Sequence, residues 1–294
     1  MSFFNIFKEK IIEPNIHENE QGLTLVDGAH ILNNCNRVKL DGTAVVLESH
    51  NTNYDSVKGH SKIQILNGGK ISDVSGKTKL GYLKDVYIAT IRGNAEVTTI
   101  NSAIIDYVKD RVVIRTMNNG VIKFLDNKAR LDTMNNGKIM FVRNRCFIGT
   151  MCNGNIDGIM DNAQISTVQN GKINYVLDKA YIGTINHCSI SEVCDNTEIG
   201  TFADGEIGII VGNSIVCQQM GGKVSTKQDG PIIVYTNKRN QGRIKKRIEK
   251  ETNIANNKEI DIDFKENVKF GEQTSILDLE NKEWILFLKL YYTH

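Results

Sequence analysis

The sequence repeats one pattern of residue types every 17 residues, without an insertion, from Ile63 to Val224. Two aliphatic columns follow this spacing, and another apolar residue stands three positions after each member. The first column is Ile63, Leu80, Val97, Ile114, Leu131, Ile148, Ile165, Ile182, Ile199 and Val216. The second is Ile71, Ile88, Ile105, Ile122, Ile139, Ile156, Ile173, Ile190, Ile207 and Val224. Such a spacing predicts a repeat architecture in which each unit packs on its neighbours.

Each repeat has the pattern of two short strands joined by turns. A small residue usually stands two positions before each aliphatic residue, which is the alternation of a strand with one buried face. Pairs such as Asn136-Gly137 and Asp161-Asn162 follow the strands and tolerate positive φ. A unit this short buries its aliphatic side chains only by stacking on other units. We therefore predict an all-β fold, a single-stranded parallel β-solenoid with coils roughly 4.8 Å apart, and expect a right-handed β-helix.

The pattern divides the chain into three parts. Residues 1–21 hold a short amphipathic stretch, which we expect to cap the first coil, with a weak membrane-surface anchor as the alternative. Residues 22–235 form the solenoid, with less regular coils before Ile63. Residues 236–294 contain a basic stretch and the apolar run Trp284–Tyr292. We expect this last part to fold back on the solenoid, cap its end or make a subunit contact.

Composition narrows the class of protein. The net charge is +2, which gives no reason to expect nucleic acid as a partner. The six cysteines form no C-x-x-C pair, so we expect no metal, no cofactor and a reducing compartment. No secretory signal is recognisable, and the run at Trp284–Tyr292 is too short to span a bilayer. These features favour a cytoplasmic protein, with peripheral membrane association, a virion or the cell surface as alternatives.

Two rows of residues on the outside of the coils are candidate sites. One row changes from charged to apolar midway along the solenoid, and we interpret its apolar part as an interface: Met160, Leu177, Cys194 and Val211. The other row is aromatic, with a gap at Gly158, and is a candidate strip for a planar or apolar ligand: Tyr107, Phe124, Phe141 and Tyr175. The alternatives for the second row are turn packing and cover by the C-terminal part of the chain.

Three polar rows read as parts of the scaffold. Thr99, Thr116 and Thr133 begin a row of threonines, which suits strands with stacked hydroxyls. Asn119, Asn136, Asn153 and Asn170 form a turn ladder, in which we expect amides to share hydrogen bonds from coil to coil. Asp161, Asp178 and Asp195 stack in the opposite turn, where we favour turn formation over a cation site.

Catalytic motifs are absent from the sequence. There is no G-x-S-x-G, no H-E-x-x-H and no phosphate-binding loop, and none of the six histidines has a recognisable partner by spacing. We therefore predict no catalytic residue. β-Helical polysaccharide lyases and hydrolases insert long loops between coils, for which this repeat leaves no room.

The coil length, the lack of loops over residues 61–235 and the start MSFFNIFKEK resemble bactofilins, the polymer-forming β-helical cytoskeletal proteins of bacteria. The resemblance implies end-to-end self-assembly and membrane association. The long C-terminal part departs from the bactofilin pattern and would be placed to block one end. The Asn- and Gly-rich coils are also similar to solenoids of phage and bacterial appendage proteins.

These observations favour a non-enzymatic structural or binding protein, either a self-associating scaffold or a protein-interaction module. The expected partner is a second copy of the chain, and another protein or a small ligand is the alternative. A second possibility is a decoy, of the kind that phages encode, which sequesters a ligand or a protein. A third is a carbohydrate-active β-helix enzyme.

Overall fold

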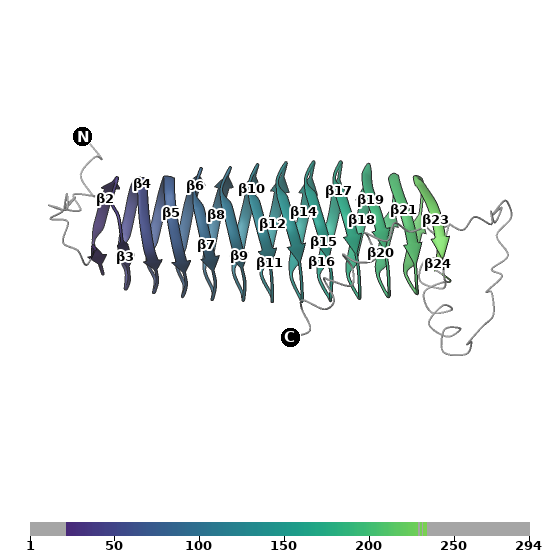
Figure 1. The fold of residues 1–294 in the computed structure, drawn as a ribbon, viewed down its shortest axis with the longest axis horizontal. Helices are drawn as coiled ribbons and strands as arrows, with labels where there is room; N and C mark the ends of the chain where they lie inside the picture. Colours follow the sequence, from purple (N-terminus) through teal and green to yellow (C-terminus); the bar gives the residue numbers. More distant parts are fainter. Residues whose placement is uncertain (1–21, 229, 231, 234–294) are drawn as a thin grey trace, which may run out of the picture. The chain divides into compact units, whose positions relative to one another are not determined.

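The computed structural model describes residues 22–228, 230, 232 and 233, and these residues form the predicted stack of parallel strands (Figure 1). All of their strands belong to one sheet, and none of them is helical. This part of the chain accordingly contains no helix that is long and apolar enough to span a membrane. The predicted N-terminal cap and the predicted C-terminal part, residues 1–21 and 236–294, lie outside the described residues.

The first coils are less regular than the later ones, as the sequence predicts. Their strands are β1 (Thr24–Leu25), β2 (Ala29–Asn33), β3 (Val38–Leu40), β4 (Val45–Val57) and β5 (Lys62–Val74). β4 and β5 each run through what is a turn in later coils, with Asn51 and Gly68 at positive φ inside them. The repeat predicts two short strands per coil from Ile63 onward, so the single long β5 is a departure from that pattern.

From Lys79 onward each coil contributes two short strands that belong to two stacks. The first stack is β6 (Lys79–Lys84), β8 (Glu96–Asn101), β10 (Val113–Asn118), β12 (Arg130–Asn135), β14 (Phe147–Cys152), β16 (Gln164–Gln169), β18 (Tyr181–Asn186), β20 (Glu198–Phe202), β22 (Ile215–Gln219) and β24 (Ile232–Ile233). The second is β7 (Tyr87–Ile91), β9 (Ile104–Val108), β11 (Val121–Leu125), β13 (Lys138–Val142), β15 (Asn155–Ile159), β17 (Lys172–Val176), β19 (Cys188–Val193), β21 (Gly205–Val211) and β23 (Lys223–Gln228).

The strands pair in parallel and in register with the strand one coil away. Ile148 on β14 lies beside Ile165 on β16, which in turn lies beside Ile182 on β18. The second stack follows the same rule at Ile139, Ile156 and Ile173. The predicted columns are thus rows of neighbouring side chains in space. This confirms the predicted fold class, a β-solenoid with coils of about 17 residues.

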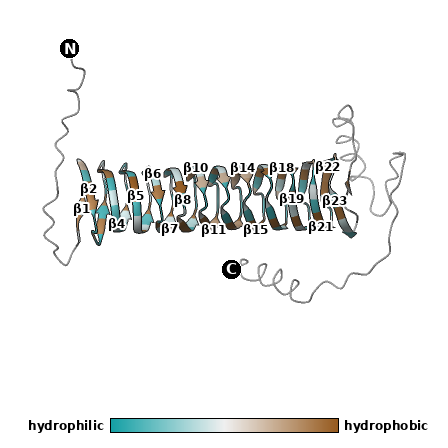
Figure 2. Cartoon of the chain, turned by 90° about the horizontal axis from the view of Figure 1, so that it is seen from above, coloured by the Kyte–Doolittle hydropathy of each residue, from teal (hydrophilic) through white to brown (hydrophobic). Residues whose placement is uncertain are grey.

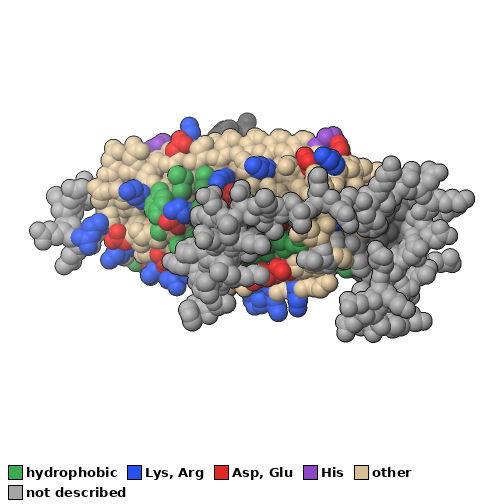
Figure 3. Space-filling view, turned by 45° about the vertical axis from the view of Figure 1, so that its right-hand side comes forward, with side chains coloured by type: hydrophobic (Ala, Val, Ile, Leu, Met, Phe, Trp, Pro, Cys, Tyr) green, Lys and Arg blue, Asp and Glu red, His purple; other side chains and the backbone are tan. Residues whose placement is uncertain are grey.

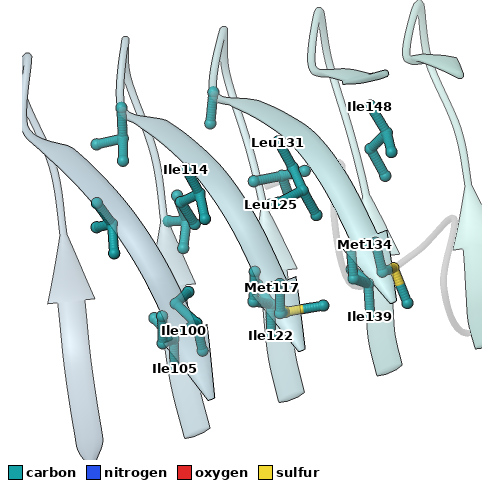
Figure 4. Packing of buried hydrophobic residues seen from close by; sticks show 14 of the residues in the cluster. Ile100, Ile105, Ile114, Met117, Ile122, Leu125, Leu131, Met134, Ile139 and Ile148 are labelled. Atoms are coloured by element: carbon teal, nitrogen blue, oxygen red, sulfur yellow. The ribbon is translucent and has the colours of Figure 1, made fainter. Parts of the chain in front are cut away.

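The core lies between the two stacks and continues from coil to coil (Figure 4). Figure 4 shows Met134 of the first stack beside Ile139 of the second, and places Ile114, Leu131 and Ile122 elsewhere along the same core. All five side chains are fully buried. Hydrophobic and hydrophilic residues recur along successive coils (Figure 2), because each coil buries the same positions, as Val97 and Ile100 on β8, and leaves the residues between them outside.

The turns use residues at positive φ, as their sequence suggests. The four asparagines of the predicted ladder have φ between 51° and 53°: Asn119, Asn136, Asn153 and Asn170. Their coil-to-coil hydrogen bonds come from the backbone, as from Asn136 N to Cys152 O over 2.9 Å. A side-chain amide bond occurs one residue earlier than expected, from Asn135 Nδ2 to Asn118 Oδ1 at 3.0 Å. The ladder is therefore scaffold, as predicted, but its side-chain link sits in the preceding column.

The aspartates of the opposite turn also bind the backbone. Asp161 N donates to Asp178 Oδ2, and Asp178 N donates to Asp195 Oδ2, each over 3.1 Å. Each of these carboxylates therefore accepts a hydrogen bond from the coil before it. These bonds tie each turn to the turn of the next coil, which supports turn formation as the role of this row.

Candidate interaction surface

The aromatic row forms a stack of rings along the second strand stack. Tyr107 and Phe124 lie 5.0 Å apart between ring centroids, with 9° between their planes. Phe124 and Phe141 follow at 5.6 Å and 19°. Arg143 places its guanidinium carbon 5.0 Å from the centroid of the Phe124 ring. Phe124, the middle ring, thus stacks with a neighbouring ring on each side and also contacts Arg143.

The predicted gap at Gly158 is filled. A Cβ atom added to Gly158 would lie 3.0 Å from Cδ1 of Phe141 and 3.3 Å from Cε of Met160. The side chains on either side therefore close over the glycine, and the aromatic row shows no open notch there.

The apolar row and the end of the aromatic row form one cluster. Met160, Leu177 and Cys194 pack together, each directly after the last residue of β15, β17 and β19, respectively. Their side chains are only 8%, 5% and 8% exposed. Phe141, Tyr175 and Val211 pack against them. Self-association through this row stays a prediction, and the exposed apolar surface lies elsewhere.

A buried carboxylate borders this cluster. The Cys194 thiol donates to Oε1 of Glu192 over 3.0 Å, and Glu192 is 8% exposed. Burial, with the charge of Glu192 as a second cause, raises the pKa of Tyr175 above its usual value. The tyrosine hydroxyl therefore keeps its proton over the physiological pH range.

Two of the exposed large apolar side chains lie close together on β9, beside half-buried apolar side chains of β11. Ile104 is 45% exposed and Tyr107 is 44% exposed, and Val121 and Phe124 are half-buried beside them. Register pairs Ile104 with Val121 and Tyr107 with Phe124. We call these four side chains the β9–β11 patch. Figure 3 shows hydrophobic side chains gathered on one face with Lys, Arg, Asp and Glu around them.

Charges of opposite sign stand at equivalent places on the two strands of the patch. Asp106 on β9 lies one coil from Lys123 on β11, and Lys123 Nζ is 2.8 Å from Asp106 Oδ1. Tyr87 Oη also donates to Asp106 Oδ2, at 2.6 Å. Burial opposes ionisation of Asp106, but the hydrogen bonds from Lys123 and Tyr87 prevail and lower its pKa. Lys109 and Asp126, which follow the two strands, repeat the reversal of sign.

A shallow hollow of about 410 Å³ lies over the turns that follow β9, β11 and β13. Its lining is entirely polar: Asp110, Arg111, Asn127, Lys128, Asn144 and Arg145. A smaller hollow of about 180 Å³ lies over β13, β15 and β17, and Lys138 and Asp157 in its lining form an ion pair at 2.9 Å. Neither hollow contains a histidine or a cysteine.

Groups suited to metal binding or nucleophilic catalysis do not converge in the described coils. Within residues 22–228, 230, 232 and 233, no three His, Cys, Asp or Glu side chains are placed to hold a metal ion. All six cysteines are free thiols. His187 pairs with Asp204 at 3.0 Å, but both side chains are about half exposed.

Sequence reasoning placed Tyr107 and Phe124 in one row but missed Ile104, Val121 and the reversed charges beside them. The signal was available, because Asp106 and Lys123 are one repeat apart and carry opposite charge.

Comparison with protein-family models, with curated proteins and with solved structures finds no match to this chain.

Proposed function

We propose that this chain is a non-enzymatic scaffold that self-associates, and that the β9–β11 patch is the contact between two copies. The observation that carries the proposal is an exposed apolar patch flanked by charges whose sign reverses from one coil to the next. Exposed apolar patches of this kind mark interaction sites. The resemblance to bactofilins, which implies self-assembly, points the same way.

The reversal of sign makes the patch complementary to itself. A two-fold axis parallel to the strands would set β9 of one copy against β11 of the other, because it reverses the order of the coils. Asp106 would then face Lys123 of the second copy, and Lys109 would face Asp126 of the second copy. Tyr107 and Phe124 would meet at the centre. A two-fold axis along the stack would instead set Asp106 against Lys109 and Lys123 against Asp126, which are also opposite charges, so the exchange of Asp106 and Lys123 described below separates the two arrangements.

Rows of side chains on a stack of coils suit a scaffold. Register is kept in every pairing from β6 to β24, and the turns between these strands are short. Each coil contacts its neighbours over its whole length, so the surface rows hold fixed spacings. A fixed spacing preorganises the contact groups and lowers the entropy lost on association.

Light scattering after size exclusion tests the proposal. We expect the mass of the full chain to rise from one copy to two with concentration, and Lys123→Glu to weaken association at least tenfold, because it sets two carboxylates against Asp106. The double variant Asp106→Lys with Lys123→Glu should restore association. Lys62→Glu, an equal change on the exposed face of β5, should behave as wild type.

Two outcomes would contradict this function. A wild-type chain that stays a single copy at every concentration removes self-association altogether. Equal effects of Lys123→Glu and Lys62→Glu, at unchanged circular dichroism, remove the patch as its site. Ile104→Ser adds a check without a charge change, since it removes apolar area from an exposed strand position and should also weaken association.

A second candidate function is the sequestration of a planar ligand. It is favoured by the aromatic stack, since Tyr107 is its exposed end. Phe124→Ala removes the ring that supports Tyr107 and should abolish any thermal shift caused by such a ligand. Equal shifts for wild type and variant would exclude the stack as its binding site.

A further inference from the structure

Two arginines of the described coils stand apart from the others. Five of the seven arginines in this part of the chain form ion pairs: Arg37, Arg92, Arg115, Arg130 and Arg143. Within the described residues, Arg111 and Arg145 form none. Both line the 410 Å³ hollow, and Lys128 lines it between them. The hollow thus gathers three cations that this part of the chain does not neutralise.

These three cations form an evenly spaced row. Arg111, Lys128 and Arg145 occupy the same position in consecutive coils. Coils stack at roughly 4.8 Å, so the row covers on the order of 10 Å. All three side chains are exposed. Like charges at this spacing repel one another, and a ligand that carries several negative groups would relieve that repulsion.

The carboxylates near the row already have partners. Asp110 accepts hydrogen bonds from Gly93 N at 3.0 Å and from Asn127 Nδ2 at 3.1 Å. Asp126 is held by Arg143 at 2.5 Å. These bonds place the acidic groups against the scaffold. The positive field of the row is therefore directed outward, toward solvent.

We propose that this hollow binds a linear acidic polysaccharide. Its sulfate or carboxylate groups would meet Arg111, Lys128 and Arg145, and a guanidinium can donate two parallel hydrogen bonds to such a group. The amide nitrogens of Asn127 and Asn144, which also line the hollow, donate to Asp110 and Asp126, so their amide oxygens are the acceptors offered to sugar hydroxyls. The hollow has no aromatic lining on which bases would stack, which favours a sugar polymer over a single-stranded nucleic acid.

Binding of a fluorescent heparin oligosaccharide to the full chain tests this site. Each neutralised arginine should weaken binding about fivefold at low salt, so Arg111→Gln with Arg145→Gln should lose on the order of 25-fold. Arg115→Gln is the matched control, because it removes the same charge from an arginine that pairs with Glu96 and Asp132. The basic stretch after Tyr235 is common to all variants and cancels in the comparison.

A variant that removes a negative charge from the hollow, and should therefore strengthen binding, completes the test. Asp110→Asn places in this turn the residue that Asn127 and Asn144 already supply one and two coils later. Asparagine keeps the positive φ of 67°, and heparin binding should strengthen a few-fold. Unchanged binding in the double variant, or an equal loss with Arg115→Gln, would overturn the site. The assignment to a polysaccharide would be overturned if polyphosphate or single-stranded DNA bound as tightly as heparin and lost affinity when Arg111 is replaced.

The binding assay is independent of self-association. Heparin binding by Lys123→Glu at concentrations where it is a single copy should match that of wild type. Loss of binding in that variant alone would place the ligand on the β9–β11 patch and contradict the inference.

Discussion

The Tyr54 hydroxyl donates a hydrogen bond to the Ser49 hydroxyl over 2.8 Å, and both side chains are fully buried within β4. Tyr54 pairs with Ile71 in the next coil, so it occupies the position that isoleucine fills from there on. Burial raises the pKa of Tyr54 far above its usual value, which keeps the hydroxyl protonated and able to donate. The coil of β4, which precedes the regular repeat, thus has a buried polar pair where later coils have an apolar contact.

Ser49→Ala should destabilise these first coils, because it leaves the Tyr54 hydroxyl buried without this acceptor. The expected loss in the free energy of opening is about 1–3 kcal/mol, measured by native-state hydrogen exchange of the β4 and β5 amides. Ser49→Ala with Tyr54→Phe removes both polar groups and should recover most of the loss. A double variant that is weaker than Ser49→Ala would contradict this account.

The thiols of Cys146 and Cys188 should be inert. Burial raises the pKa of each thiol to about 12, so neither forms thiolate at pH 8. Cys152 is partly exposed and should react first. Iodoacetamide labelling followed by peptide mass spectrometry gives the order of reaction. In urea all three should react alike, and labelling of Cys146 in the native chain as fast as Cys152 would disprove the prediction.

The turn residue Asn136 should tolerate glycine but not alanine. Its φ is 52°, a conformation that costs an L-residue with a plain Cβ about 1–2 kcal/mol. Asn136→Ala should lower the free energy of unfolding by about 1 kcal/mol, whereas Asn136→Gly should stay within about 0.5 kcal/mol of wild type. Both keep the backbone bond to Cys152. Chemical denaturation compares the three proteins, and equal midpoints would contradict the role of φ.

Removal of one whole coil should leave the fold intact. Deletion of residues 164–180 joins Ala163 to Tyr181, which pairs with Gln164 in the wild type and so takes its place. The circular dichroism per residue should stay the same, and small-angle scattering should show a stack shorter by about 4.8 Å. Deletion of residues 164–179, one residue fewer, shifts the alternation of the strands and should prevent folding of the coils that follow. If the two deletion variants folded equally well, strand register would be excluded as the reason why the fold tolerates the loss of a whole coil.

The regular coils could be predicted because their signals are local and repeated. Ile148, Ile165 and Ile182 stand 17 residues apart, and the structure places them side by side. Asn-Gly and Asp-Asn pairs indicated turns, where Asn136 and Asp161 adopt positive φ. Each feature recurs in many coils, so chance agreement at one position had little influence.

The candidate surface was less accessible to sequence reasoning. Exposure separates Tyr107 from Leu177, which is 5% exposed, although both belong to outward rows. That difference arises from packing between neighbouring rows, as between Phe141 and Met160 across Gly158. Hydrophobic pattern gives the side of the strand on which a residue lies, but not what packs over it. Tyr54 was missed for a related reason, since a tyrosine in a column of isoleucines reads as a break until its partner Ser49 is located.

The hydrogen bonds between coils, such as those that link β14 to β16 and β16 to β18, run along the stack rather than across it. Tension applied to the two ends of the described coils would therefore load one junction at a time, beginning at an end. Each coil that detached would release roughly 55 Å of extended chain. Force spectroscopy would then record a series of unfolding steps of equal length, and such a stack would dissipate an applied load one coil at a time.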